Sequence, residues 1–412
     1  APTFGSIHRC VDNAVAGYTP NVVVVGGGLT GGNAALEVCR LAPDAHVTLI
    51  SSETHLPYQR PPLSKGFLRG TEPFEAALVA PRSEYERLGI DLMLGRTVEK
   101  LEPEKKQIRL EGDEVIPYDR MLIATGGRNR RLRSPGADRK GVLDLRTVED
   151  SQRIQAAARA GRRAVVIGLG FIGCEVTASL RMLGVEVTAI DPGRAPLGRV
   201  LGPEVGGVIA ALHQSHGVQL ILGDGVDRLE GGERVERVVT KSGRQFECDF
   251  VVAGIGIEPE VELLRAAGAR ISNGVEVDEY CRTSLPDVYA AGDIADHAHP
   301  IFGRIRVEHY NNAEKQGRAA AASLLDRGSP YDYVHSFWSD QFDQSLEYVG
   351  FAKEWDSITV EGSLPDRDFI VRYLRGGKLL AAAAMGRGGD PESDEPGELK
   401  SIANQIRAGR SS

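Results

Sequence analysis

Two sets of three glycines share the spacing G-x-G-x-x-G, and each set lies between an apolar strand pattern and a run of small, apolar residues. The sets are Gly26, Gly28 and Gly31 in "NVVVVGGGLTGGNAAL", and Gly168, Gly170 and Gly173 in "RRAVVIGLGFIGCEV". At this spacing the first glycine makes the turn, the second lets backbone approach a pyrophosphate, and the third lets the helix pack on the strand. One copy is weak evidence, but two copies in the same context predict two bound dinucleotides.

An acidic residue follows each glycine set near the end of the next predicted strand. Glu53 closes "AHVTLISSE" and Asp191 closes "VEVTAID". A carboxylate here accepts hydrogen bonds from a ribose and repels a 2′-phosphate. Asp191 therefore predicts NAD rather than NADP at the second site. The nearby Arg194 and Arg199 are either nucleotide contacts, which would weaken this preference, or solvated loop residues.

Two further turns point to a flavin. "YDRMLIATGG" runs into Thr125 and Gly126, and "TSLPDVYAAGDIAD" contains Gly292 and Asp293. With these turns the chain resembles the flavoprotein reductases that have two dinucleotide-binding domains. The resemblance implies that Thr125–Gly126 abuts the first site and that Asp293 binds the ribitol of FAD. The alternative for Asp293 is an ordinary turn or N-cap residue.

The stretch "HLPYQRPPLSK", residues 55–65, contains three prolines, which predict a stiff, extended loop. The surrounding "SSETHLPYQRPPLSKGFLRG" has no cysteine, which disfavours a thiol relay beside the flavin. This stretch closely resembles the PY-x-RPPLSK motif of the oxygenase-coupled NADH–ferredoxin reductases, which are related to apoptosis-inducing-factor-like oxidoreductases. "FIGCE", "VEHYNNAEKQG" and "FWSDQF" match the same family, and the resemblance extends from about Asn21 to Gly386.

The resemblance implies a role for each matching residue. Arg60 and Pro61 line the FAD, and Lys65 lies beside the reactive flavin ring. Glu175 pairs with Lys65 and faces the nicotinamide. A fixed ammonium there stabilises the negative charge that hydride transfer brings, and a carboxylate keeps a partly buried lysine protonated. The alternative is a purely structural ion pair between domains.

The same resemblance gives roles to three residues near the C-terminal part of the chain. A helix starting near residue 311, entered through Glu308 and His309, points its N-terminus at the flavin. Hydride and electron transfer need no general acid, so a hydrogen-bonding or packing role is favoured for His309. Trp338 lies beside the isoalloxazine near the path to the electron acceptor; the alternative is a core aromatic residue.

The order of the motifs predicts an α/β fold with two Rossmann-like dinucleotide-binding domains and a C-terminal α+β domain. FAD elements occur before and after the second glycine set, so the NAD domain is inserted into the FAD domain. Gly376–Gly377 predicts a hairpin, and "ELKSIANQIRAG" a short helix. The predicted boundaries are 1–20 for an N-terminal arm, 21–133 and 248–327 for the FAD domain, 134–247 for the NAD domain, and 328–412 for the C-terminal domain.

Composition excludes several other classes of protein. The 412 residues carry a net charge of −8, which argues against a nucleic-acid coat. No apolar run is long enough to span a bilayer, and five scattered cysteines without a C-x-x-C indicate a reducing, cytoplasmic setting. His297 and His299 form an H-x-H, but without a cysteine or carboxylate partner they are interpreted as solvated loop residues, and no metal is predicted.

The resemblance implies that hydride passes from NADH to FAD and that single electrons then pass to a small, acidic [2Fe-2S] ferredoxin serving a P450 or Rieske-type oxygenase. A basic cluster in the sequence offers a docking face for such a partner. It comprises Arg128, Arg130, Arg131, Arg133, Arg139 and Lys140. The alternatives are that these residues form a solvated linker between domains and that Arg128 contacts FAD instead.

The acidic insert "GRGGDPESDEPGEL" departs from the family pattern. It leaves open how the partner docks and whether the protein is a monomer or a weak homodimer.

Two other functions remain open from the sequence. The same flavin site suits a reductase of a small acceptor, such as monodehydroascorbate, quinone or oxygen. It also suits a redox-gated binding protein of the apoptosis-inducing-factor kind. The first differs in acceptor kinetics, and the second in slow flavin reduction by NADH.

Overall fold

Two runs of buried apolar residues form the central strands of two parallel sheets. In the computed structural model, which describes residues 19–409, β1 (Asn21–Val25) has four fully or almost fully buried valines. Such a run suits a strand covered on both faces. The first sheet has the order β19-β7-β1-β2-β3 and is parallel throughout. Its other strands are β2 (His46–Ser51), β3 (Asp91–Leu94), β7 (Arg120–Ile123) and β19 (Val288–Ala290).

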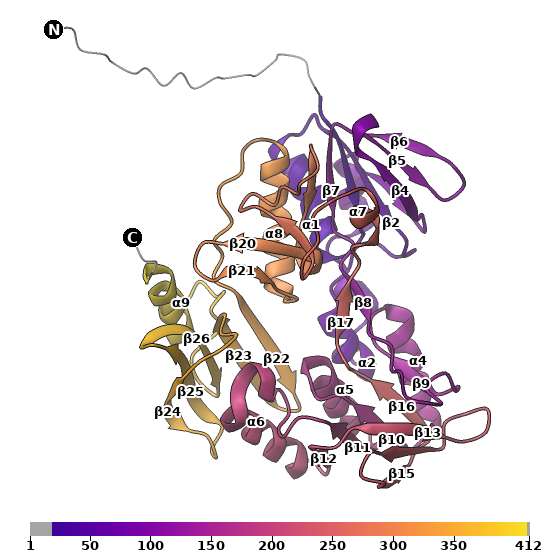
Figure 1. The fold of residues 1–412 in the computed structure, drawn as a ribbon, viewed down its shortest axis with the longest axis vertical. Coiled ribbons are helices and arrows are strands. Elements are labelled where there is room, and N and C mark those ends of the chain that lie inside the picture. The colour runs from indigo at the N-terminus through magenta and orange to yellow at the C-terminus, as the bar shows by residue number, and fades with distance from the viewer. Residues whose placement is uncertain (1–18, 410–412) are drawn as a thin grey trace, which may run out of the picture.

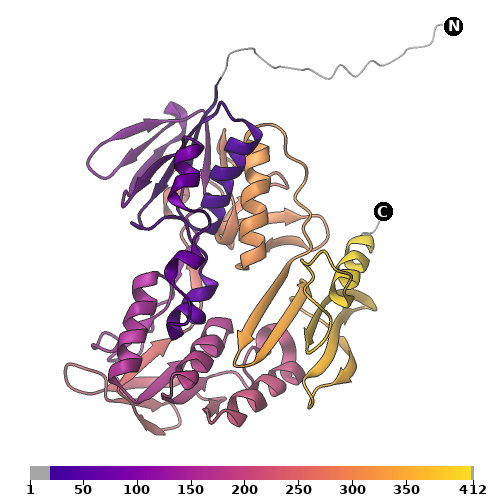
Figure 2. The same ribbon diagram turned by 180° about the vertical axis from the view of Figure 1, so that it is seen from behind.

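Helices α1 (Leu29–Leu41) and α8 (Tyr310–Leu324) pack side by side against this sheet (Figure 2). In the sequence α1 precedes the second unit and α8 follows it, so the first unit is assembled from segments on both sides of the second. This is the expected consequence of an inserted domain.

The second unit repeats the first. Its sheet has the order β12-β11-β10-β16-β9 and is also parallel. Its strands and helices are β9 (Val142–Asp144), α4 (Val148–Ala160), β10 (Arg163–Ile167), α5 (Phe171–Met182), β11 (Glu186–Asp191), α6 (Gly198–Ser215), β12 (Gln219–Leu222) and β16 (Phe250–Ala253). The boundary expected after residue 247 is therefore placed too early, because β16 is hydrogen-bonded to β10 from Ala164↔Phe250 to Ile167↔Ala253.

The chain crosses between the two units twice, at neighbouring places. Strand β8 (Gly127–Asn129) leads into the second unit and β17 (Ile257–Pro259) leads out of it. The two strands pair antiparallel, so entry and exit lie in one ladder (Figure 1).

The C-terminal unit is a five-stranded antiparallel sheet with the order β22-β23-β26-β25-β24. Helix α9 (Glu398–Ala408) packs on it through Leu399, Ile402 and Ile406. The strands are β22 (Ser336–Gln341), β23 (Gln344–Gly350), β24 (Ser357–Ser363), β25 (Asp368–Arg375) and β26 (Lys378–Met385). The two-residue connection between β25 and β26 confirms the predicted glycine hairpin, and α9 confirms the predicted short helix.

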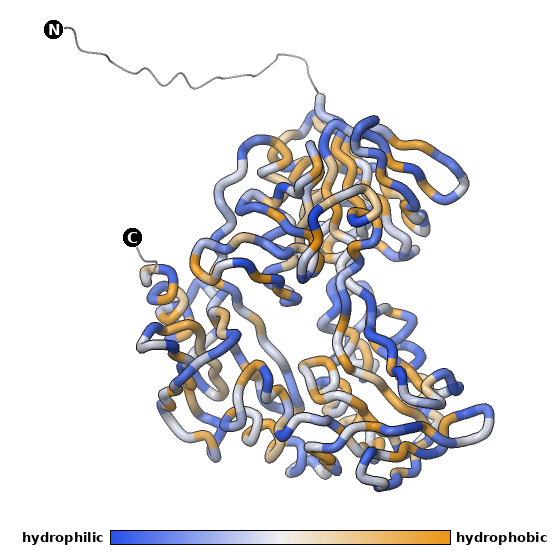
Figure 3. The backbone as a smooth tube through the Cα atoms, viewed as in Figure 1, coloured by the Kyte–Doolittle hydropathy of each residue, from blue (hydrophilic) through white to orange (hydrophobic). Residues whose placement is uncertain are grey.

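Smaller elements complete the fold, and hydrophobic residues concentrate on the strands inside each unit (Figure 3). They are α2 (Gly66–Arg69), α3 (Arg82–Arg87), β4 (Val98–Glu102), β5 (Gln107–Leu110), β6 (Val115–Pro117), β13 (Val226–Glu230), β14 (Arg237–Thr240), β15 (Gln245–Glu247), α7 (Glu262–Ala266), β18 (Val275–Val277), β20 (Ala295–His299) and β21 (Gly303–Arg306). Over residues 19–409, no helix is long and apolar enough to cross a membrane. The expected N-terminal arm, apart from its last two residues, lies outside the described residues.

Candidate active site

The first and third glycines of each set are required by packing. Gly26 has φ +115°, and a Cβ there would lie 2.2 Å from the carbonyl oxygen of Ala124, just before Thr125. A Cβ on Gly31 would lie 1.9 Å from the carbonyl oxygen of Gly26. Gly168 and Gly173 repeat this arrangement in the second unit, with contacts of 2.5 and 1.9 Å to backbone carbonyl oxygens. The predicted tight turns are therefore present at both sites.

The second glycine of each set is different, because nothing in the protein requires it. Gly28 and Gly170 have φ of −85° and −75°, which any residue adopts, and a Cβ on either would meet nothing within 4 Å. Each lies directly before a helix, α1 or α5, that has no side-chain cap and no acidic residue in its first turn. This open, uncapped helix end fits the pyrophosphate of a bound dinucleotide.

The two acidic residues already have partners in the protein. Glu53 accepts hydrogen bonds from the Tyr58 hydroxyl at 2.5 Å and from Arg60 at 2.9 Å. Asp191 accepts the backbone N–H groups of Leu169 and Gly193, both at 2.6 Å, so its carboxylate braces the second glycine loop. Both carboxylates are thus fixed in orientation at the ends of their strands.

The Gly292–Asp293 turn lies against the first dinucleotide site. A Cβ on Gly292 would lie 2.3 Å from the hydroxyl of Thr30, in the first turn of α1. The Asp293 carboxylate accepts a hydrogen bond from Arg146 at 3.2 Å. Burial and the nearby Arg60 guanidinium lower the pKa of Arg146, and its Nε has no partner among the described groups. No motif marks Arg146, so the sequence did not reveal it.

The lysine of the proline-rich stretch does pair with Glu175. Lys65 Nζ lies 3.2 Å from Glu175 Oε1, and the two side chains are only 13% and 5% exposed. The stretch is not an extended loop, however: Pro61–Ser64 form a 3-10 turn. Proline is favoured at the first position of such a turn, because its φ is already helical and its missing N–H is not needed there.

All three units contribute to the surroundings of this ion pair. Glu175, in α5, also accepts hydrogen bonds from Ser64 at 2.5 Å and from Ser339, in β22, at 2.8 Å. The Trp338 ring lies 5.6 Å from Lys65 Nζ, and its indole N–H donates to Asp340 at 3.2 Å. A buried charge pair is stable only when its remaining hydrogen-bonding capacity is filled, and the two serines do this for Glu175.

A series of buried hydrogen bonds runs from Glu175 through Ser339 and Gln341 of the C-terminal sheet and back to the second unit. Gln341 donates to Ser339 at 3.2 Å and is 2.9 Å from His213 Nε2, in α6. These residues are buried, and a connected chain of this kind fixes the orientation of its terminal group. These hydrogen bonds join residues that are far apart in the sequence: His213 and Gln341 are separated by 128 positions, and Glu175 and Ser339 by 164. No sequence motif indicated them.

The residues at the start of α8 fit a packing role. His309 is the N-cap residue of α8, and burial lowers its pKa to about 4, so it is neutral at pH 7. Its ring packs edge-on against Phe337. Glu308 pairs with Arg306 at 2.6 Å. Neutral His309 therefore carries no imidazolium proton to donate at neutral pH.

Acid should destabilise the fold through its buried neutral histidines. Burial lowers the pKa of both His213 and His309 to about 4 in the folded chain, from about 6.5 for an exposed histidine. The unfolded chain therefore binds protons below pH 6.5 that the folded chain does not, and stability is lost as pH falls from 6.5 towards 4. Each histidine contributes a slope of up to about 1.4 kcal/mol per pH unit. The free energy of unfolding is measured by denaturant titration at a series of pH values between 4 and 6.5. It should fall less steeply with decreasing pH in His213→Gln than in wild type.

The matched control for this experiment is exposed His46, in β2. His46→Gln should keep the wild-type slope. Equal slopes in wild type and His213→Gln would contradict a neutral, buried His213.

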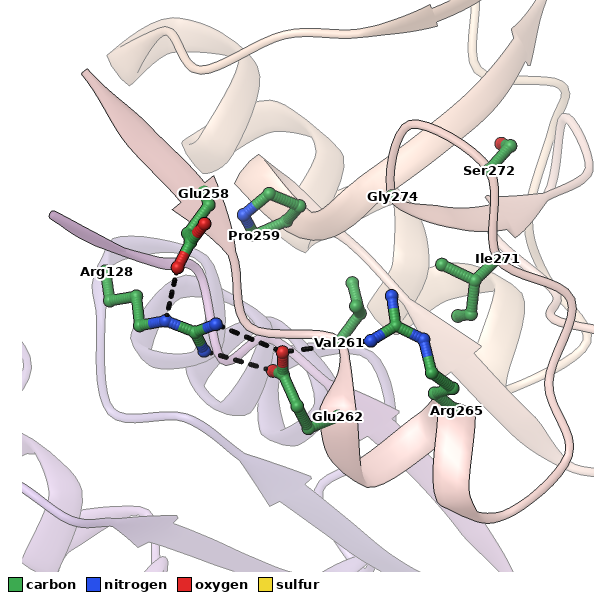
Figure 4. Close-up of a pocket in the computed structure, with 9 residues that line it drawn as sticks. All are labelled: Arg128, Glu258, Pro259, Val261, Glu262, Arg265, Ile271, Ser272 and Gly274. Carbon is green, nitrogen blue, oxygen red and sulfur yellow. Dashed lines mark hydrogen bonds and ion pairs between the residues drawn. The ribbon is translucent and has the colours of Figure 1, made fainter. Parts of the chain in front are cut away.

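Two residues of the predicted basic docking face pair with carboxylates, and two others bind backbone carbonyl groups. Arg128 binds Glu258, Glu260 and Glu262, with distances of 2.8, 2.8 and 3.2 Å, and Figure 4 shows the pairs with Glu258 and Glu262. Arg130 donates to the carbonyl of Ile257. Two further members are also engaged, Arg139 with the carbonyl of Gly231 and Lys140 with Glu233. The three carboxylates around Arg128 come from the returning crossover, which is adjacent in space but distant in sequence.

The acidic insert folds back onto the start of the C-terminal sheet. Glu392 accepts hydrogen bonds from Tyr333 at 2.6 Å and Ser336 at 2.9 Å, and pairs with Lys315 at 2.7 Å. Together with Trp338 and Tyr310 it lines a pocket of about 380 Å³. The insert therefore has a structural role beside the candidate site.

Two family models match this chain, one over the two nucleotide-binding units and one over the C-terminal unit. Residues 20–317 match the family described as pyridine nucleotide-disulphide oxidoreductase, and residues 336–393 match the reductase C-terminal family. The chain is 40% identical to the 5,5′-dehydrodivanillate O-demethylase ferredoxin reductase subunit of Sphingobium sp., over 89% of this chain and 90% of that protein. It is 35% identical to putidaredoxin reductase of Pseudomonas putida, over 89% of each.

Solved structures agree with these matches. The fold is similar to the reductase in the covalent putidaredoxin reductase–putidaredoxin complex, with a TM-score of 0.89, 34% identity, and coverage of 94% of this chain and 93% of that one. It is also similar to the ferredoxin reductase for the CYP199A2 system from Rhodopseudomonas palustris. There the TM-score is 0.87 at 33% identity, over 90% of this chain and 92% of that one.

Proposed function

Because the chain belongs to the pyridine nucleotide-disulphide oxidoreductase family, we propose that it is the NADH-dependent, FAD-containing reductase of an oxygenase system. Its electron acceptor is then a small, acidic [2Fe-2S] ferredoxin that serves a P450 or Rieske-type oxygenase. The similarity to ferredoxin reductase components over nearly the whole chain supports this proposal. When bound, FAD accepts a hydride from NADH and can release its electrons one at a time.

The observation that carries the proposal is the buried Lys65–Glu175 pair where three units meet. The carboxylate balances the charge of the partly buried lysine, and the positive charge of the ammonium favours reduction of a neighbouring group. Ser64 and Ser339 hold the Glu175 carboxylate, so the ammonium has a fixed position. Trp338 covers the same site from the C-terminal sheet.

The thiols of the described residues are unsuited to a disulfide relay. Cys39, Cys174, Cys248 and Cys281 are all free and buried, and burial raises the pKa of each thiol. A thiolate is the reactive form, so these groups are unreactive at neutral pH. Electrons leaving the flavin therefore go to an external acceptor in this proposal.

The test is a comparison of acceptors. Purified protein is reduced anaerobically with NADH in a stopped-flow instrument, and turnover is then measured with a [2Fe-2S] ferredoxin, a quinone, monodehydroascorbate and oxygen. Fast flavin reduction with ferredoxin as the preferred acceptor is expected. Preference for any other acceptor would reject the ferredoxin assignment. Slow reduction followed by a long-lived charge-transfer complex would instead indicate a redox-gated binding protein.

We expect the enzyme to prefer NADH because Asp191 places a fixed negative charge at the end of β11, where NADPH carries its 2′-phosphate. Wild type should favour NADH at least about tenfold in kcat/KM, and Asp191→Asn should reduce this ratio by about tenfold. Asparagine removes the charge but keeps an acceptor for only one of the Leu169 and Gly193 amides, so the Tm of the variant is measured alongside its cofactor preference.

The matched control for this substitution is Asp227→Asn, at an exposed acid of the same unit that pairs with Arg228. It should leave the cofactor preference unchanged. A wild-type preference for NADPH would overturn the role given to Asp191.

A further inference from the structure

Three buried histidines converge on one point away from the Lys65–Glu175 site. His297 and His299 lie two residues apart on β20, so they share one face of the strand, and His335 immediately precedes β22. Their exposed fractions are 1%, 3% and 0%. The interpretation of the H-x-H as solvated loop residues is therefore wrong, because β20 lies inside a three-stranded sheet covered by the segment leading to β22.

The three rings form a nearly regular triangle. Their centres are 5.6 Å apart for His297–His299, 5.6 Å for His297–His335 and 5.3 Å for His299–His335. One nitrogen from each ring lies within 4.8 Å of the other two. A triangle with sides of at most 4.8 Å has its centre within about 2.8 Å of each corner, so small side-chain rotations reach the roughly 2.0–2.1 Å of a zinc–imidazole bond.

Two of these imidazoles have hydrogen-bonding capacity that the protein does not fill. Both ring nitrogens of His335 are buried and have no hydrogen-bond partner in the described part of the chain, and those of His297 are buried and have only weak contacts with the backbone at Ala295 and Ile305. An unsatisfied buried polar group costs about 1–3 kcal/mol, and native proteins rarely leave several together unless water or an ion occupies the space.

The third histidine is oriented by the backbone. His299 Nε2 lies 2.9 Å from the carbonyl oxygen of Tyr333, and its Nδ1 accepts N–H groups from Ile301 at 3.1 Å and Phe302 at 3.3 Å. The proton is therefore on Nε2, and Nδ1 carries the lone pair. Metal-binding histidines commonly donate their second ring N–H to a backbone carbonyl in this way. Coordination through Nδ1 would replace the two longer amide contacts.

Burial favours the neutral form of two of these rings, His297 and His335. Burial, helped by His299 and Arg304, lowers the pKa of His297 to about 3, and burial likewise lowers that of His335 well below its usual value. Two aromatic rings, those of Phe302 and Phe351, pack around His335. Titratable groups near the cluster include His309, at the start of α8, and Glu392, which is hydrogen-bonded to Tyr333.

We propose that His297, His299 and His335 form a binding site for a divalent transition-metal ion of the zinc class. Three imidazoles without a carboxylate ligand select zinc or its neighbours over magnesium or calcium, and a water completes the coordination. The ion joins β20 of the first unit to His335, the residue just before the first strand of the C-terminal sheet. Its role is structural: it fixes β22, which carries Trp338 and Ser339, against the first unit.

The test uses the full-length flavoprotein, treated with a chelator and then given Zn²⁺ alone. After gel filtration, metal analysis should find one zinc per chain in wild type and less than about 0.1 in His297→Gln and His335→Gln. His46→Gln, at an exposed histidine, is the matched control and should retain the full equivalent. Zinc should also raise the Tm of wild type and His46→Gln but not of the other two variants.

Two results would overturn the proposal. One is wild type that retains less than about 0.1 zinc, which would leave an ordered water as the occupant. The other is equal retention by wild type and both variants, which would indicate adventitious surface binding. X-ray absorption of the zinc-loaded wild type gives an answer even if the variants do not fold, because three imidazole ligands at about 2.0 Å are expected.

Discussion

Replacing Lys65 by methionine or Glu175 by glutamine is expected to slow flavin reduction by NADH on the order of 100-fold while FAD remains bound. Lys65→Met removes the buried ammonium, and Glu175→Gln removes the charge that holds it. Glutamine can still bond to Ser64 and Ser339, so packing between the three units is largely kept. The measurement is the rate of flavin reduction at saturating NADH, with the flavin spectrum as the test for bound FAD.

A double-mutant cycle separates a catalytic pair from a structural one. Because the two charges act together, the double variant should be about as slow as either single variant. The matched control is Lys140→Met, which breaks an exposed pair with Glu233 and should not change the rate. Unchanged rates in Lys65→Met and Glu175→Gln, with normal NADH binding, would limit the pair to a structural role.

Valine at the second glycine of each set is expected to remove one cofactor without unfolding the protein. Gly28→Val should abolish FAD binding, whereas Gly170→Val should keep FAD and raise the KM for NADH at least about tenfold. The reason is that neither Cβ meets any protein atom within 4 Å and neither backbone needs glycine, so the added methyl groups occupy only the ligand's space.

The two variants act as controls for each other, because each changes the opposite nucleotide site. A further control is Gly232→Val, in a turn where a Cβ also meets nothing within 4 Å. It should leave both cofactors bound. Measurements are flavin content, KM for NADH and Tm. Loss of FAD in Gly170→Val, or full FAD content in Gly28→Val, would contradict the assignment of the two sites.

Local signals in the sequence were sufficient to predict the two glycine turns of the nucleotide sites. Each glycine set spans six residues and lies between a strand and a helix, so backbone geometry over a short stretch determines the outcome. Lys65 and Glu175 lie 110 positions apart, and only resemblance to a family brought them together. Their pairing in the structure confirms that expectation, whereas their catalytic role stays a prediction.

The features that sequence reasoning missed depend on contacts between distant segments. Ser339 and Gln341 are ordinary polar residues of a strand until the fold places them against Glu175. Arg128 belongs to a basic run in the sequence, but the returning crossover surrounds it with three carboxylates. His335 has no metal-binding spacing relative to His297, and only the sheet brings them together.

The paired strands β8 and β17 have a consequence for engineering. Since both crossings lie in one two-stranded ladder, the whole NAD unit is topologically a single long loop of its host. The host sheet, with β1 at its centre, is complete without any strand of the insert. A nucleotide-binding module of different cofactor preference, grafted between those two strands, would therefore exchange the reductant if it also supplies the partners that Lys65 and Asp293 have in Glu175 and Arg146.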